Sequence, residues 1–167
     1  MDFIQIALVL AVLLLLAIPM GRYIARAFSL EETRLDRAFG GIEKVIYKLS
    51  GISQGNMKWK QYAKALLVSN IAMFAICYII VRLQGVLPGN PSGIASMDPF
   101  LSFNTVASFL TNTNLQHYSG ESGLSYLSQM MVIIFLMFTT PATGIALCIA
   151  FMRGLTGQKS IGNFYVD

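Results

Sequence analysis

Three long apolar runs, none of which contains a charged residue, constrain this chain more than any other feature. The runs are FIQIALVLAVLLLLAIPM at 3–20, ALLVSNIAMFAICYIIV at 65–81 and MMVIIFLMFTTPATGIALCIAFM at 130–152. A helix of about 17–25 mainly apolar residues is long enough to cross a bilayer. Charged residues make up 12% of the chain, whereas soluble domains carry about 25%. The sequence therefore predicts an all-α integral membrane protein with three transmembrane helices.

The positive charge is concentrated between the first two apolar runs. Residues 22–64 hold nine of the twelve Lys and Arg, and only Arg82 lies between the second and third runs. Arg153 and Lys159 follow the third run. Because cytoplasmic loops are enriched in Lys and Arg, we expect the 22–64 loop and the carboxyl end in the cytoplasm. The amino terminus and the loop at 83–129 are then outside. Acidic residues are mixed into the basic loop, so we expect no nucleic-acid partner.

The loop at 29–60 contains a segment with helical periodicity. Its apolar residues recur every three or four positions, with basic residues between them: Leu35, Phe39, Ile42, Val45, Ile46 and Leu49. This pattern predicts an amphipathic helix on the inner surface of the membrane, although Gly40-Gly41 weakens its start. The alternative is a docking face for a partner subunit.

A short apolar helix is predicted upstream of the third run. Asp98 and Pro99 are typical of an N-cap and a first helical residue, and the residues that follow predict a helix over 99–110. A helix of this length extends about 18 Å, which is too short to cross the bilayer. The segment has no charged residue. We therefore expect it to enter the membrane and return on the same side, as a re-entrant pore helix.

The residues after this helix, TNTNLQ at 111–116, are suited to contact a cation. Carbonyl groups at a helix C-terminus lack donors and carry partial negative charge. Together with Thr and Asn oxygens, backbone carbonyls can replace the hydration shell of a monovalent ion. Divalent ions usually recruit carboxylates, but no Asp or Glu lies between 99 and 120. We interpret 111–116 as one segment of a monovalent-cation filter. The alternative is an external turn capped by Asn side chains.

The same region resembles a known family. FNTVASFLTNTNLQHYSGESGLSYLSQM at 103–130 is similar to the first pore region of the potassium-binding A subunit (KdpA) of the Kdp potassium-transporting ATPase, and TNTN-x-Q-x-YSGE is a specific signature. Three more stretches resemble this subunit: MKWKQYAKALLVSN at 57–70, RLQGVLPGNP at 82–91 and SIGNFYVD at 160–167. Two departures are Leu115, where the family commonly has Trp, and Gly89, where it commonly has Leu.

The resemblance implies a fold like a fused potassium channel, with one extra amino-terminal helix before four helix–pore loop–helix units. By position, Asn112, Thr113 and Asn114 would supply potassium ligands, mainly backbone oxygens. Thr111 would begin the filter, and Gln116 would lie just outside it. In this family the ion passes to a P-type ATPase subunit, KdpB, and KdpC and KdpF are accessory subunits. The implied function is a non-catalytic, potassium-binding subunit in the bacterial inner membrane, with potassium as transported ligand and no organic cofactor.

On this interpretation the chain divides into four segments. Residues 1–28 form the amino-terminal transmembrane helix, 29–60 the cytoplasmic loop, 61–155 the first helix–pore helix–filter–helix unit, and 156–167 a cytoplasmic segment leading to a next unit. The chain would then correspond to the amino-terminal third or less of a complete subunit. Two rival functions stay open. One is a one-unit cation channel assembled as a homotetramer, and the other is a small membrane protein that regulates or scaffolds a partner.

Several polar residues carry expectations of their own. Asn70 is expected to form a hydrogen bond between helices, with ion contact as the alternative, and Arg82 is expected to extend to the membrane interface. His117 is either a hydrogen-bonded vestibule residue or a proton sensor. Glu121 either attracts cations or bonds to the neighbouring backbone. Near Pro141 the third helix is expected to break or kink, because proline frees a backbone carbonyl.

Overall fold

The computed structural model describes residues 2–28 and 34–167. It contains two compact units, residues 1–54 and 55–167, which are described separately. The described residues form helices joined by turns and loops, without β-strands. Three helical segments are long and apolar enough to cross a membrane: Phe3–Arg26, Trp59–Leu83 and Tyr126–Leu155. The prediction of an all-α membrane protein with three such helices is confirmed.

The first unit contains two helices. Helix α1 spans Asp2–Phe28, and helix α2 spans Arg34–Leu49 without interruption at Gly40-Gly41. The helix predicted from the periodicity of this loop is therefore present. Its exposed apolar side chains are Ile42, Val45, Ile46 and Leu49, which belong to the predicted apolar face. The side chains of Leu35 and Phe39 lie outside the described residues.

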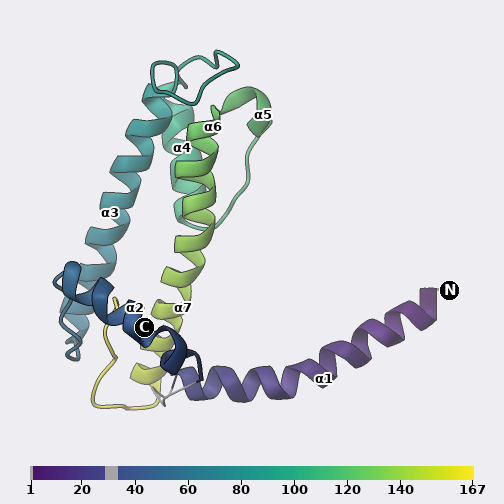
Figure 1. Ribbon diagram of the computed structural model, residues 1–167, viewed down its shortest axis with the longest axis vertical. Coiled ribbons are helices and arrows are strands. Elements are labelled where there is room, and N and C mark those ends of the chain that lie inside the picture. The colour runs from purple at the N-terminus through teal and green to yellow at the C-terminus, as the bar shows by residue number, and fades with distance from the viewer. Residues whose placement is uncertain (1, 29–33) are drawn as a thin grey trace. The chain divides into compact units, whose positions relative to one another are not determined.

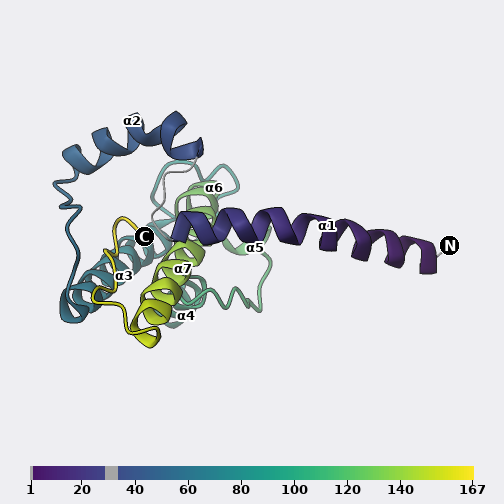
Figure 2. The ribbon, with the colours of Figure 1, turned by 90° about the horizontal axis from the view of Figure 1, so that it is seen from below.

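The second unit is a bundle of helices. Its elements are α3 (Trp59–Leu83), α4 (Pro99–Leu110), α5 (Gly120–Gly123), α6 (Tyr126–Ser128), the π-helix η1 (Gln129–Ile134) and α7 (Phe135–Leu155). Helices α3, α4 and α7 lie side by side in both ribbon views (Figure 1 and Figure 2). Helix α4 starts at the end of the bundle where α3 ends, and the chain returns to that end at α5 (Figure 1). We call this the loop end, and the opposite end, formed by residues 55–61 and 152–167, the base.

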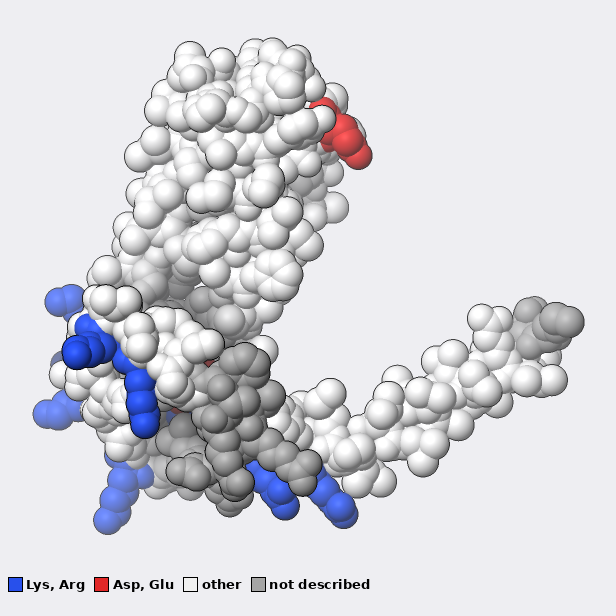
Figure 3. All heavy atoms as spheres, viewed as in Figure 1, with Lys and Arg blue, Asp and Glu red and all other residues white. Residues whose placement is uncertain are grey.

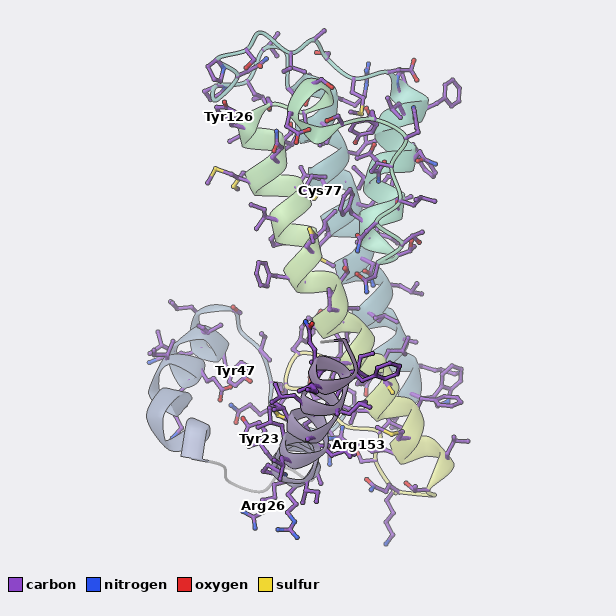
Figure 4. The ribbon with its side chains drawn as sticks, turned by 90° about the vertical axis from the view of Figure 1, so that its right-hand side faces the viewer. Tyr23, Arg26, Tyr47, Cys77, Tyr126 and Arg153 are labelled. Atoms are coloured by element: carbon purple, nitrogen blue, oxygen red, sulfur yellow. The ribbon has the colours of Figure 1, made fainter. Side chains whose placement is uncertain are left out.

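Apolar side chains hold α4 against the two long helices. The buried cluster consists of Cys77, Val81, Met97, Val106, Phe109, Leu124, Val132 and Leu136. Figure 4 shows Cys77 within the bundle. The ring of Phe74 in α3 meets the ring of Phe103 in α4 edge-on, with centroids 5.2 Å apart. Lipid is as apolar as these side chains, so in a bilayer close packing rather than removal from water favours the contact. The packing fixes the position of α4.

The irregular part of the third apolar run lies earlier than predicted. A break near Pro141 is excluded, because α7 continues through this residue, whereas the kink expected there stays a prediction. The hydroxyl groups of Thr139 and Thr140 donate to the carbonyls one turn earlier, at 2.9 Å and 2.8 Å, so these side chains are satisfied inside an intact helix. The irregularity is the π-helix η1 at Gln129–Ile134. Such wider turns are frequent at functional sites.

A buried ion pair closes the base of the second unit. Arg153 Nη1 lies 2.6 Å from Asp167 Oδ1, and the two side chains are 9% and 2% exposed. Arg153 also donates to the carbonyl of Ile161 at 3.2 Å. The side-chain amide of Asn163 donates to the carbonyl of Gly55 at 2.8 Å. These contacts tie residues 156–167 to the chain that leads into α3.

Charge is distributed unevenly along the second unit. The acidic side chains that stand out in Figure 3 lie at the loop end, where no Lys or Arg is visible on the face shown. Arg82 at this end is half-buried and donates to the carbonyl of Met97. Its extension to the membrane interface stays a prediction. Lys58, Lys60 and Lys159 belong to the base.

Candidate cation site after helix α4

The site begins with the helix that positions it. Helix α4 spans the predicted residues, Pro99–Leu110, and the carboxylate of Asp98 accepts hydrogen bonds from the N–H groups of Phe100 at 2.8 Å and Leu101 at 3.2 Å. This is the N-cap contact expected from the sequence. The helix then ends inside the bundle, and Thr111 is its C-cap.

The turn after α4 folds back onto the last turn of that helix. The N–H groups of Thr113 and Asn114 donate to the carbonyl of Ser108 at 2.9 Å and 3.3 Å, and that of Asn112 donates to Phe109 at 3.2 Å. The N–H of Leu115 donates to the hydroxyl oxygen of Ser108 at 3.2 Å. The amide hydrogens of 112–115 are therefore all directed toward α4. Ser108 anchors the turn, a role that its place in an apolar helix did not indicate.

The carbonyl oxygens of the same turn are directed elsewhere. Asn112 and Asn114 have positive φ angles of 58° and 55°, in the left-handed region where Asn is enriched among non-glycine residues. Left-handed residues separated by one ordinary residue turn successive peptide planes the same way, so N–H groups face one side and carbonyls the other. In the described part of the chain, the carbonyls of 111–114 accept no hydrogen bond. Four unpaired acceptors are thus presented on one short turn.

The polar side chains of the turn bond mainly to one another. The hydroxyl groups of Thr111 and Thr113 lie 3.0 Å apart, and the side-chain amide of Asn114 donates to the side-chain oxygen of Asn112 at 3.2 Å. Thr111 also donates to the carbonyl of Ala107 at 2.9 Å. All four residues are exposed. The side chains therefore stabilise the turn, and its backbone carbonyls are the groups left for a ligand.

Gln116 is placed next to this turn. The residue is half-buried, and neither its side-chain oxygen nor its side-chain nitrogen has a hydrogen-bond partner among the described residues. A buried amide without partners costs about 1–3 kcal/mol. The position just beyond the filter turn was predicted, but the buried, unpaired state of the amide was not. The amide can pair with a group that the described chain does not provide.

Two further residues tie together the segments that flank α4 and its turn. The hydroxyl of Tyr118 lies 2.8 Å from that of Thr105, a buried residue of α4. Gln84, 1% exposed, donates to the carbonyls of Ala95 at 2.9 Å and Gly123 at 3.0 Å. Its side-chain oxygen accepts from the N–H of Ser125 at 3.2 Å. Gln84 and Tyr118 belong to two of the family-like stretches, 82–91 and 103–130, but these stretches did not indicate their roles as tethers.

Burial raises the pKa of the Tyr118 phenol, and the hydrogen bond to Thr105 opposes that shift. The phenol is therefore neutral below its usual pKa of 10.0 and keeps its proton for hydrogen bonding.

A hollow adjoins the inner side of the turn. Its volume is about 530 Å³, and its polar lining comes from Thr111 and Asn112 of the turn and from Asn70, Thr140 and Thr143 of the long helices. Asn70 donates to the carbonyl of Leu66 in its own helix at 2.9 Å. The predicted hydrogen bond between helices is therefore wrong, because the nearest acceptor is one turn back. The hollow thus brings polar side chains of α3 and α7 close to Thr111 and Asn112, within a lining that is otherwise mainly apolar.

Three residues that follow the turn are exposed: Leu115, His117 and Glu121. His117 is exposed and meets the Tyr118 ring edge-on, with centroids 5.7 Å apart. Glu121 is exposed and accepts from the Ser119 hydroxyl, which lowers the pKa of the carboxyl. This contact supports the interpretation of Glu121 as a loop acid. Leu115 is 76% exposed, so it does not pack behind the turn.

The oxygen atoms that this site offers to a cation are uncharged. Within residues 2–28 and 34–167 no group of three or more His, Cys, Asp or Glu could hold a metal ion. Neutral carbonyls can replace the hydration shell of a monovalent cation such as potassium.

A comparison with protein families gives a match over nearly the whole chain. The family described as potassium-transporting ATPase A subunit matches residues 7–167. The chain belongs to this family, as the resemblance of the TNTN region predicted. Members of this family are potassium-transport subunits of the Kdp ATPase complex, and the chain is accordingly a multi-pass membrane protein.

Proposed function

We propose that this member of the potassium-transporting ATPase A-subunit family binds potassium with the backbone carbonyls of Thr111, Asn112, Thr113 and Asn114. The observation that carries the proposal is the turn itself: its N–H groups bond to α4, while its carbonyls accept no hydrogen bond in the described chain. Gln116 lies beside these carbonyls and tunes the affinity through its unpaired amide.

The turn supplies one side of a filter, and other segments of the subunit supply the rest. A dehydrated potassium ion needs several oxygens around it, and the carbonyls of one exposed turn cannot surround it. Residues 61–155 act as one helix–pore helix–filter–helix unit, with the pore helix at 99–110 and the filter at 111–116. Residues 1–28 form the additional membrane helix, 29–60 the loop with its surface helix, and 156–167 the segment toward a next unit.

The ion is taken from outside the cell and enters the polar hollow next to the turn. The amino terminus and the filter loop are external, and the 22–64 loop and the carboxyl end are cytoplasmic, because the basic residues gather there. The membrane is the bacterial inner membrane. The partners are the ATP-hydrolysing subunit KdpB and the accessory subunits KdpC and KdpF, so this chain itself does no chemistry.

The test compares two asparagines in the assembled transporter. Asn114→Ala replaces a residue that tolerates a left-handed backbone with one for which that conformation costs about 1–2 kcal/mol. We expect the apparent affinity for potassium uptake to fall by about 5–30-fold, the factor that corresponds to this energy. Asn104→Ala, an exposed change on α4, is the matched control and leaves uptake unchanged. An unaltered potassium affinity in Asn114→Ala would remove the basis of the site assignment.

A further inference from the structure

A groove with an apolar lining lies near the base of the second unit, and Thr111 and Asn112 do not contribute to it. Its volume is about 410 Å³, and its lining includes Trp59, Leu66, Leu147, Phe151, Leu155 and Ile161. Tyr62 also lines it, but its hydroxyl donates to the carbonyl of Ala146 at 2.8 Å and is therefore already satisfied. A groove of this kind between membrane helices is suited to a hydrocarbon chain.

A basic hollow adjoins this groove at the base. It has a volume of about 610 Å³, and Lys58, Lys60 and Lys159 contribute to its lining. Trp59 and Ile161 line both hollows, so the two lie next to each other. Neither lining contains an Asp or Glu, and none of the three lysines forms an ion pair within the part of the chain described. The hollow therefore presents uncompensated positive charge beside an apolar groove.

The side chain of Trp59 marks the boundary between the two environments. It is 66% exposed, and the ammonium group of Lys60 lies 5.5 Å from the centre of its ring. Tryptophan is enriched where hydrocarbon meets the headgroup region, and a lysine near a membrane surface contributes attraction to anionic lipid. The change from apolar to basic lining thus coincides with a residue type typical of the membrane interface.

We propose that these two hollows together bind one anionic phospholipid. An acyl chain occupies the groove between α3 and α7, and the phosphate lies among Lys58, Lys60 and Lys159. The proposal rests on the charge complementarity between the lysines and a phosphate and on the two hollows sharing Trp59 and Ile161. It does not depend on potassium binding at the filter turn, because none of the residues 111–114 lines either hollow.

The test places a photoreactive side chain in the groove of the assembled transporter. Phe151, 67% exposed, is replaced by p-benzoylphenylalanine, and the complex is reconstituted with equal amounts of dioleoylphosphatidylglycerol and dioleoylphosphatidylcholine. After illumination, mass spectrometry of the labelled peptide identifies the attached molecule. We expect phosphatidylglycerol adducts to exceed phosphatidylcholine adducts by about fivefold or more, the factor for one lysine's contribution to anionic-lipid attraction.

Two charge-removing variants separate a specific site from general attraction. The change Lys58→Gln, Lys60→Gln and Lys159→Gln should return the adduct ratio to that of the vesicle. The matched control, Arg26→Gln, Lys44→Gln and Lys48→Gln, removes the same charge from the first unit and should leave the ratio unchanged. An equal ratio in the parent complex, or equal losses in both variants, would overturn the proposal. So would an adduct with α1 or with another subunit, because a helix would then occupy the groove.

Discussion

The side-chain amide of Asn114 donates to the side-chain oxygen of Asn112 at 3.2 Å, and both residues hold left-handed backbone conformations on either side of Thr113. The contact links the two residues of the turn at which φ is positive instead of negative. It stabilises a turn in which successive carbonyls are directed away from α4. Two asparagines spaced by one residue thus supply positive φ angles, which glycine adopts without steric cost.

The first prediction concerns the backbone requirement at Asn112. Asn112→Gly retains potassium uptake in the assembled transporter, because glycine adopts positive φ without steric cost. Asn112→Val reduces it strongly, because a β-branched residue is a genuine outlier at positive φ. Potassium-dependent uptake measured for both variants checks this expectation. Equal loss in the two variants would show that the Asn side chain, rather than the backbone conformation, is what matters.

The second prediction concerns Gln84, whose side chain joins the end of α3 to two loop segments. Gln84→Leu leaves three backbone groups without their partners, and each such buried group costs about 1–3 kcal/mol. We expect a clearly lower unfolding temperature in detergent, because the loop segments at 95 and 123–125 lose their tether to the end of α3. Gln158→Leu, an exposed change near the base, is the control. Similar unfolding temperatures for the two variants would contradict the tether role.

The third prediction concerns the ion pair between Arg153 and Asp167. Removing one partner of a buried pair costs about 3–5 kcal/mol, because the other charge stays buried and unpaired. Asp167→Asn should therefore destabilise the transporter, as measured by thermal unfolding. The double change Arg153→Met and Asp167→Leu should recover most of this loss. Lys64→Met, at an exposed position of α3, gives the baseline for losing one charge, and an effect of Asp167→Asn no larger than that baseline would refute the prediction.

The fourth prediction concerns Tyr118 and pH. Tyr118→Phe removes the hydrogen bond to Thr105, which should cost about 0.5–1.5 kcal/mol of stability. Burial raises the pKa of this phenol above 10.0. Ionisation of Tyr118 therefore does not make the stability of the protein depend on pH below that value, in either the folded or the unfolded state. Its stabilising effect is lost as the pH rises above 10.0, where the unfolded chain ionises first.

The pH prediction is checked by the difference in unfolding temperature between Tyr118→Phe and the parent protein. This difference should be constant from neutral pH to about pH 9, since the phenol stays protonated there. A difference that changed across this interval would mean that Tyr118 ionises in the folded protein.

The sequence by itself determined the class of protein and the bounds of its main helices. Apolar runs at 65–81 and 130–152 lie within α3 and within the segment Tyr126–Leu155, and Asp98-Pro99 marked the start of α4. These features depend on composition, helix length and capping, which are local properties. The TNTN motif likewise sufficed to identify the family.

Only the tertiary structure decided which polar groups are paired. Asn70 was expected to serve a neighbouring helix, but its side-chain amide donates to a nearer carbonyl in its own helix. The side chain of Arg82 donates to the carbonyl of Met97, 15 residues away. The tethering role of Gln84 depends on carbonyls 11 and 39 residues away, which no local pattern specifies. The unpaired carbonyls at 111–114 are a similar case, because they depend on where the N–H groups of the turn bond on α4. Pairing of this kind depends on which groups lie close together in the folded chain, and sequence periodicity does not specify those distances.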